Sequence, residues 1–159
     1  PAWDVIPISG IIYPGQYLLI APSFQRGSLG SNVVTLPLPA PDVMGPVYDG
    51  AILVSENNGV ALMSTTMPIA AGTCPNGRPD LVDLFRYGHP NALCFEGSGP
   101  GLPTLSGIDR AVSRNDGGCV DGNDNAFDLT SSVPPMPRNS DSNAFVALSY
   151  QPALTIAGD

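Results

Sequence analysis

The chain has 159 residues, enough for one domain with a substantial hydrophobic core. Its net charge is −8, and its six basic residues are all arginines scattered along an acidic sequence. This composition argues against nucleic acid as a partner, because such binding needs clustered positive charge. No apolar stretch reaches the roughly 18–20 residues of a membrane-spanning helix, so no membrane span is expected.

Glycine and proline contribute 18 residues each and separate short hydrophobic runs, a pattern typical of strands joined by turns. No window keeps helical spacing for long. Many short strands with regular turns favour an all-β sandwich or barrel with long Pro/Gly-rich loops. The segment 37–46 holds four prolines and is expected to be an irregular connection. In chain order, the predicted strands are 16–21, 33–36, 51–55, 59–63, 81–87, 126–129, 145–150 and 154–156.

A hairpin is predicted where two of these strands follow each other closely. The apolar runs Ile52–Val54 and Val60–Leu62 are separated by a polar stretch that ends in Asn58-Gly59. Asn-Gly readily adopts the positive φ of a tight reversal. We therefore expect a turn at these two residues.

Three cysteines, Cys74, Cys94 and Cys119, are too few and too far apart for a four-thiolate zinc site. One disulfide and one odd thiol are expected. A bridge from Cys74 to Cys94 would join the loops at the two ends of the apolar run Leu81–Tyr87. Three reduced cysteines in a cytosolic protein are the alternative, because spacing alone does not fix the redox state.

No catalytic residue is predicted. His89 is the one imidazole of the sequence and lies between Gly88 and Pro90, in an expected turn. No nucleophile elbow, zinc-protease motif or phosphate-binding glycine loop occurs. Glu96 lies in a glycine-rich stretch and is expected to accept N–H bonds from that loop. The sequence therefore predicts a protein that is not an enzyme.

One acidic stretch has two interpretations. Asp121, Asn123, Asn125 and Asp128 place side-chain oxygens at near-alternating positions beside a glycine, which is chemistry that suits calcium. The same residue types cap turns by bonding to their own backbone. Both interpretations stay open at this stage, and no cofactor other than calcium is expected.

Seven stretches carry a family resemblance, and the most specific of them is Cys94-Phe95-Glu96-Gly97-Ser98-Gly99-Pro100. They occur in order at 11–20, 59–62, 80–88, 94–100, 114–119, 121–128 and 137–140. Together they resemble the lamin tail domain in the form found in bacterial secreted and surface proteins, some of which are nucleases. The resemblance implies an immunoglobulin-like β-sandwich over residues 1–140, without the family's first strands. His89-Pro90 departs from the family pattern.

A sandwich that lacks strands leaves an unpaired sheet edge. Residues 141–159, here called the tail, are apolar and rich in strand-forming residues. The tail is expected to complete its own sheet or to add to a neighbouring copy. Alternatively, the tail begins a following domain, or the missing strands lie on another piece of the same precursor. The predicted assembly residues are Phe145, Val146, Leu148, Tyr150, Leu154 and Ile156.

These observations leave three hypotheses for an extracellular or cell-surface protein. The first is a structural module that assembles with copies of itself, into a filament if every copy donates its tail forward. The second is an accessory targeting or binding domain of a larger secreted hydrolase such as a nuclease. The third is a carbohydrate- or surface-binding domain that uses exposed aromatic side chains and calcium.

Overall fold

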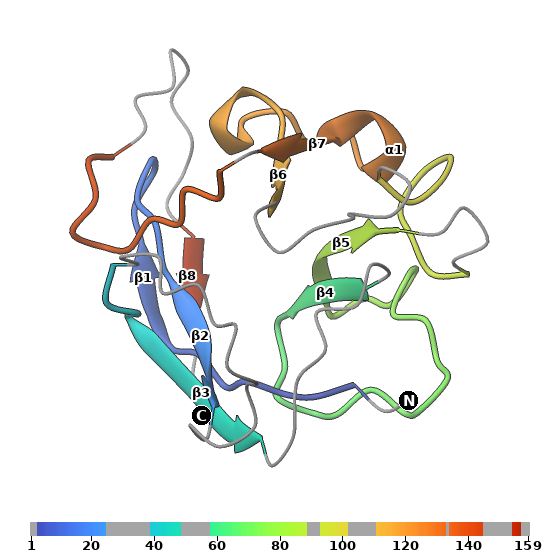
Figure 1. Cartoon of the computed structure of the whole chain (residues 1–159). Coiled ribbons are helices and arrows are strands. Elements are labelled where there is room, and N and C mark those ends of the chain that lie inside the picture. Colours follow the sequence, from blue (N-terminus) through green and yellow to red (C-terminus); the bar gives the residue numbers. More distant parts are fainter. Residues whose placement is uncertain are drawn as a thin grey trace, which may run out of the picture. The chain divides into compact units, whose positions relative to one another are not determined.

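The computed structural model describes residues 3–24, 39–48, 58–88, 93–101, 111–132, 134–144 and 154–156 (Figure 1). Over these residues the chain is mostly strand with almost no helix, so the expected β-rich fold is confirmed. The strands pair two by two. They belong to two compact units, a first of Pro1–Val5 with Val54–Met136 and a second of Ile6–Leu53 with Pro137–Asp159. A domain boundary at residue 140 stays a prediction.

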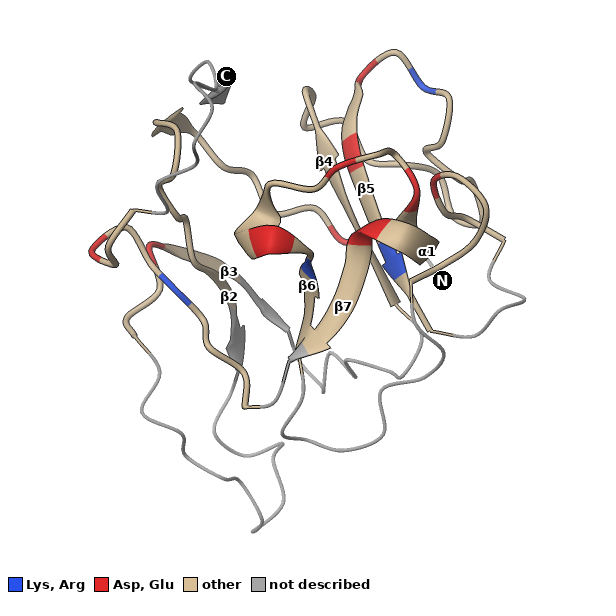
Figure 2. Ribbon diagram, turned by 90° about the horizontal axis from the view of Figure 1, so that it is seen from above, with Lys and Arg blue, Asp and Glu red and all other residues tan. Residues whose placement is uncertain are grey.

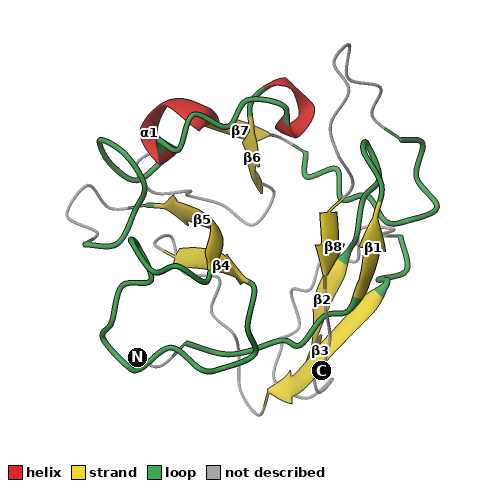
Figure 3. Ribbon diagram, turned by 180° about the vertical axis from the view of Figure 1, so that it is seen from behind, coloured by secondary structure: helices red, strands yellow, loops and turns green. Residues whose placement is uncertain are grey.

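The second unit contains two strand pairs (Figure 3). Strand β1 (Gly10–Ile12) pairs antiparallel with β8 (Leu154–Ile156). Strand β2 (Ile20–Phe24) pairs in parallel with β3 (Val43–Tyr48), with an irregularity between Ala21 and Ser23. A parallel pair needs a long crossover connection, and residues 25–42 separate these strands.

The first unit also contains two strand pairs, both antiparallel. Strand β4 (Asn58–Met63) pairs with β5 (Leu81–Tyr87), and β6 (Ala111–Arg114) pairs with β7 (Leu129–Ser132). A 3₁₀ turn, η1 (Asp116–Gly118), and the short helix α1 (Asn125–Asp128) connect β6 to β7. The buried apolar side chains among the described residues include those of Ile69, Pro75, Leu84, Tyr87 and Leu129.

Of the strands predicted from the sequence, some are confirmed, some are wrong in part, and some lie outside the described residues. The strand 81–87 is confirmed over its full length, 154–156 is confirmed as β8, and 59–63 is extended by one residue in β4. The strand predicted at 16–21 overlaps β2 only at its C-terminal end. The irregular connection predicted at 37–46 is wrong for its last residues, because β3 begins at Val43. The predicted strands 33–36, 51–55 and 145–150 lie outside the described residues.

The strand predicted at 126–129 is wrong, because most of it forms α1. The Asp124 carboxylate accepts the N–H of Ala126, and the N–H groups of Phe127 and Asp128 donate to the Asp124 carbonyl oxygen at 3.0 and 2.9 Å. These capping bonds join residues close together in the sequence, so they favour a helical turn over the strand predicted at 126–129. Only Leu129 of the predicted strand is extended, at the start of β7.

The turn predicted at Asn58-Gly59 is also wrong. Both residues lie in β4, opposite Tyr87 and Arg86 of β5, and neither has a positive φ. The Asn58 Oδ1 atom accepts the N–H of Gly59 at 2.8 Å within the extended chain. Pairing with β5 thus overrides the local preference of Asn-Gly for a reversal.

The edge of β5 that points away from β4 is capped by groups from elsewhere in the first unit. Asn125, which is fully buried, accepts the Arg86 N–H on Oδ1 at 3.0 Å and donates from Nδ2 to the Leu84 carbonyl oxygen at 2.8 Å. Gly101 continues the ladder by donating to the Arg86 oxygen at 2.8 Å and accepting the Gly88 N–H at 3.1 Å. A side-chain amide therefore stands where the peptide group of another strand would pair.

Replacing Asn125 by alanine is expected to lower the free energy of unfolding by about 2–4 kcal/mol, because buried backbone groups of β5 would lose their partners. Denaturant unfolding followed by circular dichroism measures this change. Asn76→Ala is the matched control, because Asn76 is exposed and donates one side-chain bond, to the Phe95 oxygen. Equal losses in the two variants would contradict the role given to Asn125.

Candidate functional site

The candidate assembly strand is β8, which pairs antiparallel with β1 of the same chain. The register places Gly10 opposite Ile156, Ile11 opposite Thr155 and Ile12 opposite Leu154. Two of the predicted assembly residues, Leu154 and Ile156, thus lie in a paired strand. The other four, Phe145, Val146, Leu148 and Tyr150, lie outside the described residues.

Strand β1 is followed by a tight turn that includes Pro14 and Gly15. The Gln16 N–H donates to the Tyr13 carbonyl oxygen at 2.9 Å, and the Gln16 side-chain oxygen accepts the Tyr13 N–H at 2.9 Å. Gly15 has φ of +81°, which an L side chain rarely adopts, and proline suits the position before it. The Pro-Gly turn thus defines the C-terminal limit of β1 through local sequence alone.

The chain entering the tail is tied to residues that precede β3. The Asp42 carboxylate accepts hydrogen bonds from the Ser140 N–H, from the Ser140 hydroxyl and from the Leu19 N–H, the last at 2.7 Å. Asn139 donates from Nδ2 to the Ala40 carbonyl oxygen at 3.0 Å. These bonds, called here the Asp42 anchor, position the start of the tail within the second unit.

A second contact holds the same stretch of chain. The Arg138 guanidinium lies over the Tyr17 ring, 4.8 Å from its centroid, and also donates to the Tyr17 hydroxyl. Arg138 and Asn139 belong to the stretch 137–140 that carries part of the family resemblance. Their partners are far away in sequence, so no local pattern marks these contacts.

Asp42 gives the second unit a definite pH dependence. The Ser140 hydroxyl and the Leu19 N–H stabilise the ionised carboxylate, so the pKa of Asp42 is lowered from its ordinary value of 3.8. A lowered acid pKa contributes stability that is present above the unfolded value and is lost as the pH falls through the folded value.

The variant Asp42→Asn is expected to be less stable than the wild type near pH 6, with the difference shrinking as the pH falls below about 3.8, the ordinary pKa of the carboxyl. The asparagine side chain has one acceptor oxygen, whereas the Asp42 carboxylate has two. Asparagine does not titrate, so the variant lacks the loss of stability that protonation of Asp42 causes in the wild type. Unfolding curves at pH 6 and below measure the difference. Asp141→Asn, at an exposed neighbouring residue, is the matched control. A difference that stays constant with pH would contradict the anchor.

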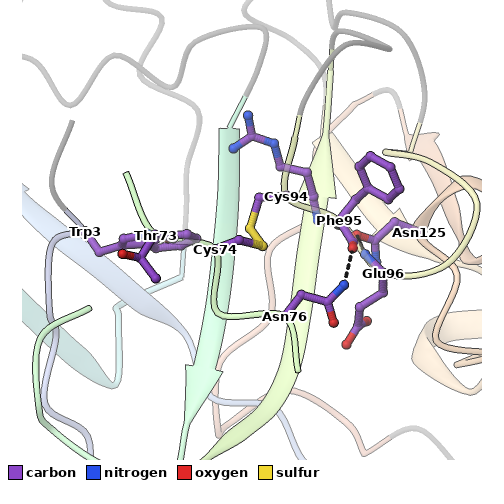
Figure 4. The surroundings of a disulfide bond; sticks show 9 residues. Trp3, Thr73, Cys74, Asn76, Cys94, Phe95, Glu96 and Asn125 are labelled. Atoms are coloured by element: carbon purple, nitrogen blue, oxygen red, sulfur yellow. Dashed lines mark hydrogen bonds between the residues drawn. A yellow bond between two sulfur atoms is a disulfide. The ribbon is translucent and has the colours of Figure 1, made fainter. Parts of the chain in front are cut away.

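The predicted disulfide is present and joins Cys74 to Cys94 (Figure 4). Asn76 bridges the same two loops by donating from Nδ2 to the Phe95 carbonyl oxygen at 2.8 Å, and Trp3 donates to the Thr73 oxygen at 3.0 Å. The loops before and after β5 are thereby tied to each other. Cys119 is free and exposed. A disulfide is typical of proteins outside the cytosol.

Reduction of the disulfide is expected to lower the free energy of unfolding by about 3 kcal/mol, because the bridge closes a loop with a sequence separation of 20 residues. Unfolding with and without reductant, in a Cys119→Ser background, measures the effect. The double variant Cys74→Ser/Cys94→Ser gives an independent value that should agree with reduction. An unchanged unfolding midpoint in reductant would show that the bridge does not stabilise the fold.

The four residues considered for calcium are each bonded within the first unit. Asn125 is bonded to β5 as described, and the Asp128 Oδ2 atom accepts the N–H groups of Gly122 at 2.8 Å and Asp124 at 3.0 Å. The Asp121 Oδ1 atom accepts the Asn123 N–H at 3.3 Å, and Asn123 has φ of +54°. Turn capping thus accounts for the Asp121 and Asp128 side chains, and bonding to β5 accounts for that of Asn125. A calcium ion stays a prediction, although no group of acidic, histidine or cysteine side chains among the described residues is arranged to hold a metal.

Arg114 is the basic residue at the end of β6, and Figure 2 colours acidic residues on β5 and in the segment between β6 and β7. Its guanidinium pairs with Asp83 of β5, with Asp121 at 3.1 Å and with Asp128 at 3.5 Å. The Arg114 side chain is only 11% exposed. This cation therefore neutralises part of the acidic cluster, a role that the sequence did not indicate.

Glu96 is buried in the loop that follows the disulfide. Burial raises the pKa of its carboxyl above the ordinary 4.5, and the nearby carboxylates Asp83 and Asp121 raise it further. The Arg114 guanidinium and the Leu84 N–H of β5 partly offset this rise. The Oε2 atom of the carboxyl has no hydrogen-bond partner among the described residues, so the expected N–H bonds from its own loop are not seen at this atom. The Glu96 main chain bonds to Asn125, which accepts its N–H at 3.3 Å and donates to its carbonyl oxygen at 3.1 Å. Glu96 therefore extends the capped edge of β5.

Glycines allow this loop to lie close to α1. A Cβ atom on Gly97, whose φ is +73°, would lie 2.3 Å from the Asp124 side chain, and one on Gly101 would lie 2.6 Å from Leu129. Both values are far below a normal contact. The glycine-rich sequence after Cys94 is thus explained by close packing against the helix and β7.

The predicted turn residue His89 lies outside the described residues. Within the described ranges no helix has the length and apolar character needed to cross a bilayer. No known protein family, curated protein or solved structure matches the chain. The lamin tail resemblance therefore rests on the sequence motifs alone.

Proposed function

We propose that this protein is a non-catalytic structural module of an extracellular or cell-surface assembly. In this proposal the strands form an immunoglobulin-like β-sandwich of the lamin tail type, and copies join by donating a strand from the tail. The observation that carries the proposal is the pairing of β8 with β1, because it places a strand of the tail in a β-ladder.

The chemistry of the described acidic side chains supports a structural role. Asp42 anchors the tail, Asp124 caps α1, and Asp128 binds backbone N–H groups and Arg114. Each of these carboxylates accepts bonds that hold the fold together. The disulfide supports an extracellular location, since such bonds persist in oxidising compartments.

Electron microscopy of native, undenatured material tests the proposal. We expect linear assemblies with a regular repeat, because donation in one direction does not close on itself. Sedimentation velocity over a range of concentrations provides the second measurement. A single monomeric species at every concentration, without assemblies in the micrographs, would contradict the proposal and favour an accessory domain of a larger secreted hydrolase.

A further inference from the structure

We propose that β8 of one copy pairs with β1 of the next copy, in the register that the two strands form within one chain. This inference rests on the proposed assembly function and names the surface that joins the copies. The acceptor is the ladder edge of Gly10–Ile12, and the occupant is Leu154–Ile156 of a second copy.

The pairing within one chain provides the argument for complementarity. Antiparallel register places Ile11 opposite Thr155, with Gly10 and Ile12 opposite the flanking residues of β8. Every copy carries the same two strands, so an exchange between copies reproduces the same backbone bonds. Exchange of an identical element is a low-cost route to association, because it needs no new complementary surface.

Strand β8 is also short compared with other paired elements. It contributes three residues to its ladder, whereas β4 and β5 pair over six and seven residues. A short ladder opens more readily than a long one, since fewer bonds break together. The three-residue ladder of β8 is therefore the one expected to open first of these two.

The chain can release β8 while the Asp42 anchor stays closed. The anchor holds Asn139 and Ser140, which precede β8 by more than ten residues in the sequence. Exchange thus requires no change in the bonds that fix the start of the tail.

The described edge of β5 is closed to such pairing. Asn125 and Gly101 already occupy outward-pointing backbone groups of this edge. An edge whose groups are bonded does not template another strand. The partner of β1 is instead a separate strand, β8, which every other copy also carries and can supply in the proposed exchange.

A reversible lock between the two strands tests the inference. The double variant Ile11→Cys/Thr155→Cys, in a Cys119→Ser background, places cysteines at opposed positions, where the Cα separation of an antiparallel pair suits a disulfide. When the monomer is oxidised before assembly, we expect loss of assembly, because β8 cannot leave its own β1. Reductant should restore assembly to the level of the Cys119→Ser parent.

Oxidation after assembly gives the complementary result. We expect a ladder of disulfide-linked multimers on a non-reducing gel, because the two cysteines then lie in different copies. The matched control is Ser113→Cys/Thr130→Cys, which locks an opposed pair of β6 and β7 in the first unit. The control should assemble equally well in both redox states.

Two results would overturn the inference. The first is a locked chain that assembles as well as the control, and the second is an assembly that oxidises only to monomers with an internal bridge. Either result leaves the proposed function standing, because assembly would then use another surface. Failure of the Cys119→Ser parent to assemble at all would instead overturn both proposals.

Discussion

The first unit depends on the buried amide of Asn125. One side chain bonds to Leu84 and Arg86 of β5, and the Asn125 backbone and side chain together bond to Glu96. A primary amide has a donor and an acceptor in the same geometry as a peptide group, so it can continue a β-ladder without another strand. Through this residue the edge of β5, the loop after the disulfide and the start of α1 become one hydrogen-bonded structure, in which a missing partner would leave buried polar groups unsatisfied.

The charges around this amide have opposing effects on stability. Glu96 is buried close to Asp83 and Asp121, and its raised pKa means that its contribution to stability is fully present below the unfolded value of 4.5 and is lost as the pH rises through the folded value. Arg114 opposes this loss, because it lies near the same carboxylates and lowers the pKa of Glu96. The positive charge of Arg114 thus reduces the repulsion between the buried Glu96 carboxyl and the carboxylates around it. The turn-capping bonds of Asp128 are part of the same arrangement, since Arg114 pairs with that carboxylate too.

Sequence reasoning succeeded where the signal was local and strong. The apolar run 81–87 became β5, and the disulfide loops were expected on either side of it. It failed at Asn58-Gly59 and at 126–129, where pairing with β5 in one case and capping by Asp124 in the other decided the conformation. It did not identify Asp42, whose bond partner Ser140 lies 98 residues away. Contacts of that range leave no periodic trace in a single sequence, so neither the anchor nor the role of Arg114 could have been predicted.

The edge of β5 in the first unit and the edge of β1 in the second are closed by different means, and the difference bears on the proposed assembly. Asn125 lies within a short helix whose cap, buried position and loop contacts hold it in place, so the edge of β5 opens only if this local structure is lost. The partner of β1 is a three-residue strand reached from the anchor through a longer connection. In the proposed exchange of this strand between copies, the bonds of the Asp42 anchor stay in place. In the proposed assembly, the same backbone chemistry protects the edge of β5 and provides the acceptor edge at β1.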